Sequence, residues 1–149
     1  MAQWHPHKTV ATVVEHNARF LMVEELINGQ LVLNQPAGHL EANESLAQAA
    51  LRETLEETAW EVELTGLLGL YQQTSSVNNI CYIRTCFIAK AIREVPGLAL
   101  DTDIVRALWL TRAELEARKE QMRSPVVLRV IDDFLLGKAY PLDVVQTLD

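Results

Sequence analysis

Three glutamates whose spacing could hold a metal ion lie near the middle of the chain. Glu53, Glu56 and Glu57 stand at positions i, i+3 and i+4, which places their side chains on one face of a helix. Like charges at these spacings destabilise a helix by about 0.2–0.5 kcal/mol per pair, and near a C-terminus the helix dipole also disfavours anions. A metal site would explain the cluster, because Mg²⁺ and Mn²⁺ prefer oxygen ligands. A solvated acidic face, with Arg52 paired to Glu56, explains this segment equally well on its own.

A helix is predicted to carry these glutamates. Asn43 is a favourable N-cap, and residues 44–58 contain neither Gly nor Pro. Apolar and small side chains recur every three or four positions, which predicts a stripe that packs on the core. This stripe consists of Ala47, Ala50, Leu51, Thr54, Leu55 and Thr58. The glutamates are expected on the helix face turned away from it.

Strands are predicted on both sides of this helix. The apolar or β-branched runs are residues 9–14, 20–24, 30–33, 62–64, 67–74, 80–92 and 104–110. Residues 34–41 are rich in residues that break regular structure, so a loop is expected there. Ser124 as N-cap and Pro125 as first helical residue predict a late helix that is ended by Gly137. Many strands with few helices predict an α/β fold in which helical layers cover a mixed sheet.

The composition narrows the classes of partner. A length of 149 residues predicts one domain, residues 1–149. The net charge of −7 and the lack of a basic stripe disfavour nucleic acid polymers and anionic membranes.

No signal-peptide pattern and no apolar run of about 18 residues occurs. Cys81 and Cys86 are too close along one predicted strand to be joined, so reduced thiols are expected. A cytoplasmic monomer or small homo-oligomer follows as the expectation.

The acidic cluster is part of a longer pattern with fixed spacing. The chain resembles the Nudix box, Gly-x5-Glu-x7-Arg-Glu-U-x-Glu-Glu-x-Gly-U, in which U is an apolar residue. The matching positions are Gly38, Glu44, Arg52, Glu53, Glu56 and Glu57, and Trp60 fills the last apolar place. Two positions depart from the pattern: Thr54 replaces an apolar residue and Ala59 replaces the glycine. If that glycine ends the helix in a left-handed conformation, alanine should cost about 1 kcal/mol there.

The resemblance implies both a fold and a chemistry. The fold would be a Nudix-type α/β/α sandwich with a mixed sheet and the loop–helix box. Glu53 and Glu57 would ligate a divalent metal, and Glu56 would join them or act through a water. The carbonyl of Gly38 would add another ligand, and Arg52 would orient the carboxylates. The implied cofactor is Mg²⁺, or alternatively Mn²⁺, bound against a diphosphate.

Further residues are candidates for the site, each with a plainer alternative. Gln35 and His39 could bind substrate from the predicted loop, although a loop histidine is more often merely polar. Glu44 is equally well explained as a favourable charge in the first helical turn. Asp103 could supply a base or a ligand from across the cleft, or only begin a strand. The least specific candidates are His5 and His7 as chelators, and Tyr82 and Trp109 as stacking partners for a base.

Shorter segments resemble the phosphatase NudJ branch of the family. They are residues 25–29, 34–41, 123–125 and 140–142. This resemblance implies hydrolysis of small diphosphates or triphosphates, namely nucleoside tri- and diphosphates and thiamine-pathway pyrophosphates, with release of orthophosphate. Two alternatives stay open. One is a nucleotide-sanitising Nudix hydrolase that releases pyrophosphate, and the other is a catalytically inactive Nudix-fold binding module.

Overall fold

The computed structural model describes residues 2–148. Its strands are β1 (His7–His16), β2 (Arg19–Ile27), β3 (Gln30–Asn34), β4 (Ala37–His39), β5 (Trp60–Thr74), β6 (Cys81–Glu94) and β7 (Ile104–Thr111). Its α-helices are α1 (Leu46–Thr58), α2 (Arg112–Ala117) and α3 (Val126–Leu135), and two 3₁₀ turns occupy Lys119–Gln121 and Leu142–Val144. No helix among these residues is both long and apolar enough to cross a membrane.

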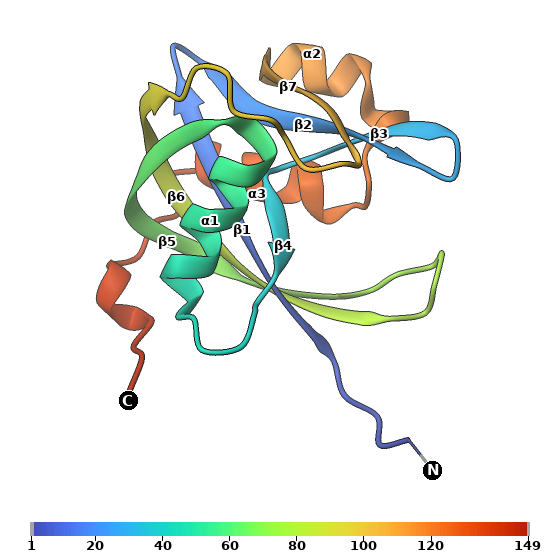
Figure 1. The fold of residues 1–149 in the computed structure, drawn as a ribbon, viewed down its shortest axis with the longest axis vertical. Coiled ribbons are helices and arrows are strands. Elements are labelled where there is room, and N and C mark those ends of the chain that lie inside the picture. The colour runs from blue at the N-terminus through green and yellow to red at the C-terminus, as the bar shows by residue number, and fades with distance from the viewer. Residues whose placement is uncertain (1, 149) are drawn as a thin grey trace.

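The strands form a mixed sheet in which β1 is central. The strand order is β3-β2-β1-β6-β5, with β4 paired to β1 and β7 paired to β2 (Figure 1). β1 and β6 are parallel, whereas the other pairs are antiparallel. β4 and β2 share one edge of β1: β4 pairs with the start of β1, and β2 pairs with its end.

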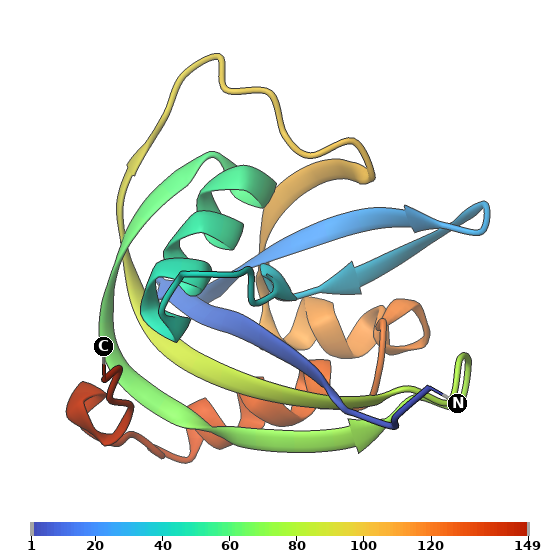
Figure 2. The ribbon, with the colours of Figure 1, turned by 60° about the horizontal axis from the view of Figure 1, so that its bottom comes forward.

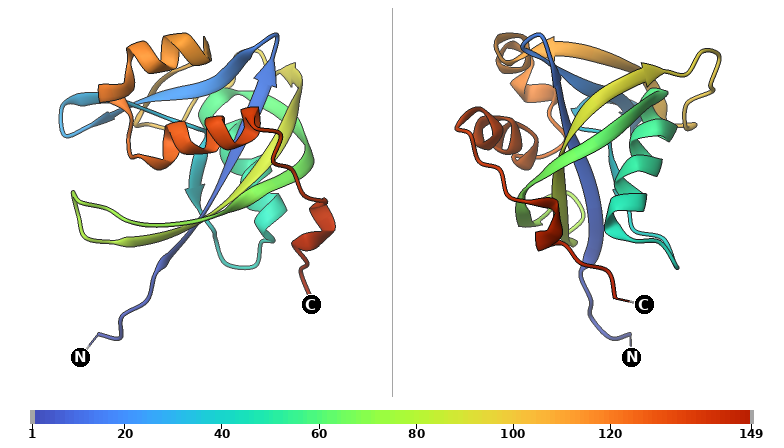
Figure 3. Two further views of the ribbon diagram at one scale, coloured as in Figure 1. Left: turned by 180° about the vertical axis from the view of Figure 1, so that it is seen from behind. Right: turned by 90° about the vertical axis from the view of Figure 1, so that its left-hand side faces the viewer.

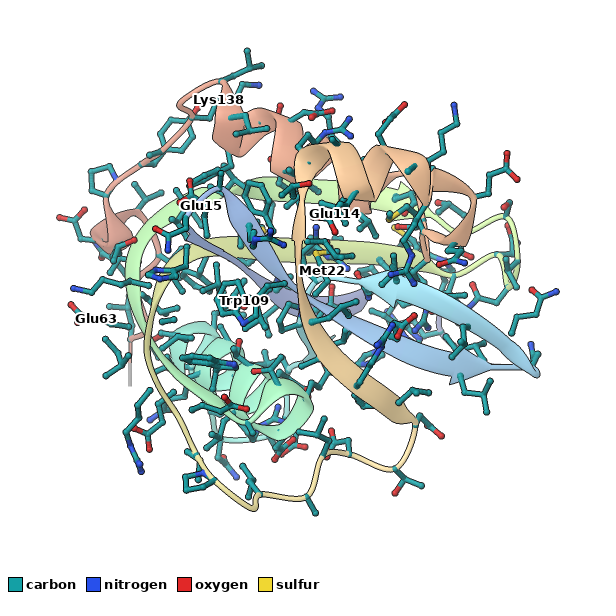
Figure 4. The ribbon with its side chains drawn as sticks, turned by 90° about the horizontal axis from the view of Figure 1, so that it is seen from above. Glu15, Met22, Glu63, Trp109, Glu114 and Lys138 are labelled. Carbon is teal, nitrogen blue, oxygen red and sulfur yellow. The ribbon has the colours of Figure 1, made fainter. Side chains whose placement is uncertain are left out.

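Helices cover both faces of the sheet, as the views from behind and from the side show (Figure 3). Successive residues of a strand point to opposite faces of the sheet. Val10 of β1 and Phe87 of β6 pack with Ala49 and Ala50 of α1 on one face. Ala11 and Cys86, their neighbours in sequence, pack in the cluster that contains Val127, Val130 and Ile131 of α3. Met22 of β2 is fully buried in that second cluster, whereas Glu63 and Lys138 lie at the periphery (Figure 4). The predicted α/β/α sandwich with a mixed sheet is confirmed.

The loop predicted at residues 34–41 is wrong in part. Ala37, Gly38 and His39 form β4 and pair with Ala11, Val10 and Thr9 of β1. The two predicted strands at 62–64 and 67–74 are one long strand, β5, which curls around α1 (Figure 2). Its pairing with β6 shifts register between Leu64 and Gly66 and again between Leu67 and Gly69. Such irregularities bend a strand, and bending lets β5 follow the curvature of the sheet.

The predicted N-caps of two helices are also corrected. Ser45, rather than Asn43, caps α1: its hydroxyl accepts from the backbone of Gln48, whose side chain accepts in turn from Ser45 N. This reciprocal capping box satisfies two backbone donors, which explains why the helix begins two residues later than expected. Pro125, rather than Ser124, occupies the N-cap position of α3, and no side chain caps that helix.

The apolar stripe of α1 is rotated from the predicted one. Ala49 is fully buried although it was left out of the stripe, and Leu51, which was included, is 39% exposed. The rotation brings Glu57 to the inner side, where only 7% of it is exposed. The prediction that all three glutamates lie away from the core is therefore wrong for Glu57.

The end of α1 has the geometry expected for the missing glycine. Ala59 follows the last helical residue with φ 62° and ψ 17°, in the left-handed region, and its N–H donates to Leu55 O. A residue with a side chain is disfavoured in this region, and glycine is not. Cys81 and Cys86 are both buried free thiols, which confirms the expectation that they are not joined.

Candidate active site at the mouth of a cleft

Arg52 holds two glutamates of α1 and one that precedes this helix together. Its guanidinium donates to Glu44 at 2.6 Å, to Glu53 at 2.7 Å and to Glu56 at 3.3 Å. It also donates to the carbonyl of His39 at 3.1 Å, which ties β4 to the helix. These contacts lower the pKa of Glu44 to about 2 and raise the pKa of Arg52 itself. The expected position of Glu44 in the first helical turn is wrong, because α1 begins at Leu46 and Glu44 precedes its N-cap. Glu44 instead accepts hydrogen bonds from Arg52.

A carboxylate from a distant segment joins two of these glutamates. Oxygen atoms of Glu53, Glu56 and Asp101 all lie within 4.8 Å of one another. The loop that carries Asp101 is fastened to α1, because Asp101 N donates to Glu56 O at 3.1 Å. Sequence reasoning considered Asp103 for a ligand from across the cleft and missed Asp101, two residues earlier. Asp103 also lines the cleft, and its carbonyl accepts from Leu26 N.

Glu57 lies deeper than the other acidic residues. Its Oε1 accepts from Ala37 N at 2.8 Å, so the carboxylate is fixed beneath β4. Burial, together with the nearby carboxylates of Glu25, Glu53 and Asp101, raises the pKa of Glu57 to about 9, against the opposing hydrogen bond from Ala37 N. Such a shift records a carboxylate that lacks a cationic partner. A cation bound beside it would supply one.

Gly38 must be a glycine because the carboxylate of Glu53 occupies the space that a side chain would need. A Cβ atom built on Gly38 would lie 2.1 Å from the carboxyl carbon of Glu53. The backbone of β4 and the carboxylates of α1 therefore meet at one point. The carboxylate oxygens of Glu53, Glu56 and Asp101 form a donor set that fits a hard divalent cation, which takes oxygen ligands. Of the residues predicted to hold the metal, Glu53 and Glu56 share a carboxylate cluster with Asp101, and Gly38 lies against Glu53. Glu57 is outside this cluster and bonds to Ala37 N.

The acidic cluster borders a cleft of about 850 Å³. The β2–β3 and β5–β6 hairpins project from the same side of the molecule (Figures 1 and 2). The first hairpin contributes Ile27 and Asn28 to the lining, and the second contributes Val77 and Asn78. Gly38, Glu57 and Asp101 also line it, so the carboxylates and the cleft are continuous. A cleft of this size accommodates a small organic molecule.

Gln35 does not reach the cleft, so its predicted contact with substrate is corrected. Its side chain is fully buried, donates to the carbonyl of Val127 at 2.7 Å and accepts from Arg84 at 3.0 Å. Arg84, which does line the cleft, was missed because a lone arginine within an apolar run carries no motif. Tyr82, two residues earlier on β6, also lines the cleft.

His39 lies at the rim, next to the N-terminal strand. It lines the cleft, and its Nε2 is 3.1 Å from Nδ1 of His7. Burial and the neighbouring His7 lower the pKa of His39. His5 stacks on His7 outside the cleft. Trp109 is absent from the lining and packs edge-on against Trp60 at 5.5 Å, as a structural aromatic residue would.

The fold and this site together define a class of protein. A family model described as the NUDIX domain matches residues 5–130. The chain therefore belongs to the Nudix family and is a Nudix hydrolase.

Particular relatives narrow the comparison further. The chain is 36% identical over 140 residues to the proteins named Phosphatase NudJ of Shigella boydii serotype 4 (strain Sb227) and Escherichia coli (strain K12). Each alignment covers 94% of this chain and 90% of the relative. A solved NUDIX hydrolase from Nitrosomonas europaea is 42% identical with a TM-score of 0.94, covering 97% of this chain and 98% of that one. The NUDIX domain of Shewanella oneidensis NrtR, solved in complex with ADP ribose, has a TM-score of 0.68 at 18% identity, covers 91% of this chain and 90% of that one, and shares the fold.

Proposed function

We propose that this protein is a Mg²⁺-dependent phosphatase of small organic diphosphates and triphosphates. Its substrates would be nucleoside tri- and diphosphates and thiamine-pathway pyrophosphates, from which it releases orthophosphate. The observation that carries the proposal is the group of converging oxygens from Glu53, Glu56 and Asp101 at the mouth of a cleft. The similarity to proteins named Phosphatase NudJ supports the choice of reaction. One domain, residues 1–149, would carry the whole activity.

The residues present can divide the work of such a reaction. Glu53, Glu56 and Asp101 would hold Mg²⁺, or Mn²⁺ in its place, with Glu57 and the carbonyl of Gly38 as further ligands. A bound divalent ion would neutralise phosphate charge and lower the pKa of a bound water. Arg52 keeps the glutamates in position through its hydrogen bonds. His39, at the rim, would contact a phosphate.

The partners follow from the shape and charge of the site. The cleft is lined by residues of the β2–β3 and β5–β6 hairpins, and the chain carries a net charge of −7, which repels nucleic acid polymers. A compact metal-bound diphosphate suits it better. We also propose a cytoplasmic location, since a reducing compartment preserves the two buried free thiols. The protein would act there as a monomer or small homo-oligomer, without membrane attachment.

Product analysis tests the proposed reaction. The purified protein with Mg²⁺ is given a nucleoside triphosphate, the matching diphosphate and thiamine pyrophosphate, and the products are separated by ion chromatography. We expect orthophosphate from all three at comparable efficiency, because binding through metal and phosphate discriminates little between organic groups. Pyrophosphate and monophosphate from the triphosphate, with the diphosphate untouched, would instead identify the nucleotide-sanitising alternative. Tight binding without any product would identify the inactive binding module.

A further inference from the structure

Among the described residues, one buried cation of the cleft, Arg84, forms no salt bridge. Arg84 of β6 lines the cleft, and only 9% of it is exposed. Its guanidinium donates to Gln35 Oε1 at 3.0 Å and to Asn34 Oδ1 at 3.2 Å, and both acceptors are neutral amides. Within residues 2–148, it forms no ion pair with any carboxylate.

This arrangement is costly for the protein without a ligand. A buried charge is normally paired, because removal from water disfavours it strongly. Burial accordingly lowers the pKa of Arg84. Glu25, which also lines the cleft, is paired with Arg123, which donates to it at 2.5 Å. Glu57, which also lines the cleft, accepts a hydrogen bond from Ala37 N. The charges of Glu25 and Glu57 act on Arg84, but neither carboxylate forms a salt bridge with it among the described residues.

The guanidinium is also held in one orientation. Gln35 is fully buried and anchored by its bond to the Val127 carbonyl, so the amide that receives Arg84 cannot turn away. An arginine has five N–H donors in a planar fork, and only two of its bonds are made to protein groups. Its other N–H donors make no hydrogen bond to a described protein group, and Arg84 lines the cleft. A fixed fork with free donors suits an oxyanion that can accept two hydrogen bonds.

The strand register places this cation at a distance from the acidic cluster. His39 of β4 pairs with Thr9 of β1, and Thr9 pairs with Arg84 of β6. His39 and Arg84 are thus separated by two strand spacings, about 10 Å along the sheet. Gly38, where the backbone meets the carboxylates, is the neighbour of His39. One ligand in the cleft can therefore reach the acidic cluster and Arg84 at different points.

We propose that Arg84 binds the terminal phosphate of the substrate. A recessed donor on the floor of a cleft is reached by the end of a phosphate chain more easily than by its middle. A terminal phosphate also carries the higher charge and has free oxygens for the fork. This inference rests on the proposed function and deepens it: Arg84 selects substrates that end in a phosphate over diphosphates capped by organic groups at both ends. Orthophosphate, the expected product, binds at the same place.

The test compares Arg84→Met and Arg84→Lys with a matched control, Arg93→Met. Arg93 lies on the same strand but is exposed, outside the cleft, and paired with Glu61. Thermal melts are recorded across an orthophosphate titration in EDTA at fixed ionic strength, so that no metal contributes to phosphate binding. The wild type and Arg93→Met should gain Tm with orthophosphate, Arg84→Lys should gain less, and Arg84→Met should gain nothing. Equal gains in the wild type and Arg84→Met would overturn the proposal.

Kinetics with Mg²⁺ provide the second readout. For a nucleoside diphosphate, Arg84→Met should raise KM at least about tenfold, since a hydrogen bond to a charged group contributes about 1.5–3 kcal/mol. For a diphosphate capped at both ends, KM should be the same in the two proteins. If Arg84→Met does not fold, Arg84→Lys, which keeps the charge, carries both measurements. An unchanged KM for the nucleoside diphosphate would refute the role of Arg84.

The two proposals can fail separately. If orthophosphate raises Tm through Arg84 but no substrate is hydrolysed with Mg²⁺, the anion site stands and the phosphatase proposal is rejected. If the enzyme is active and Arg84→Met keeps both its KM and its response to orthophosphate, the phosphatase proposal stands and the Arg84 site is rejected.

Discussion

Glu53 and Glu57 are the residues on which the proposed chemistry depends most directly. Glu53 touches the space that only a glycine at position 38 leaves free, and Glu57 is fixed under β4 by Ala37 N. We expect Glu53→Gln and Glu57→Gln each to lower kcat at least about 100-fold, since even replacing a partner of a metal ligand costs about 10–100-fold. Initial rates at saturating Mg²⁺ measure this loss, and circular dichroism confirms that the variants are folded.

Glu63→Gln is the matched control for these two variants. Glu63 is an exposed glutamate of β5 at the periphery of the molecule, away from the cleft (Figure 4). Its replacement removes the same charge and should leave kcat unchanged. Wild-type turnover in Glu53→Gln and Glu57→Gln would show that the acidic cluster has no part in catalysis.

The raised pKa of Glu57 predicts a pH dependence of stability in EDTA. The pKa of about 9 in the folded protein lies above the ordinary value of 4.5, so the folded state holds an extra proton between these pH values. This contribution to stability is fully present below about pH 4.5 and is lost as the pH rises towards 9. The amide of the Glu57→Gln variant does not ionise, so the free energy of unfolding of this variant should fall less than that of the wild type as the pH rises towards 9. Urea titrations at several pH values measure the difference; parallel curves for both proteins would contradict the assignment.

At the scale of the element, the end of α1 is strained at Ala59. Its φ of 62° is in the left-handed region, which glycine adopts without cost. We expect Ala59→Gly to stabilise the protein by about 1 kcal/mol, with a higher Tm in thermal melts. Ala47→Gly, inside the same helix, should have the opposite sign and cost about 0.5–1 kcal/mol. A loss of stability in both variants would mean that the helix end is not strained.

At the scale of the whole molecule, a divalent cation links segments that are distant in sequence. The oxygens that would bind it come from β4, α1 and the loop before β7, so binding requires the folded state. A ligand that binds only the folded state stabilises it by about 2.7 kcal/mol at a hundredfold excess over its Kd. We therefore expect Tm to rise across a Mg²⁺ titration at fixed ionic strength, and EDTA to abolish activity. A flat titration, together with turnover in EDTA, would refute metal dependence.

Local sequence patterns were enough for much of the fold and part of the site. Helical spacing alone places residues i and i+3 on one face of a helix, and Glu53 and Glu56 accordingly belong to one carboxylate cluster. The position of α1 and most strands followed from periodicity, and the left-handed end at Ala59 followed from the expected glycine. Local patterns failed at the start of α1, where Ser45 is the N-cap although Asn43 also suits the role. They also failed at β4, because this strand is three residues long and exists through its pairing with β1.

Only the tertiary structure decided which distant groups share the site. Asp101 joins the glutamates because its loop hydrogen-bonds to the backbone of α1, a contact that no local pattern encodes. The rotation of α1 against the sheet buried Glu57, and the same packing placed Gln35 in the core and Arg84 on the floor of the cleft. The physical reason is that spacing along a chain fixes which side chains share a face. Packing between elements fixes which of those side chains lose their water and which charges face one another.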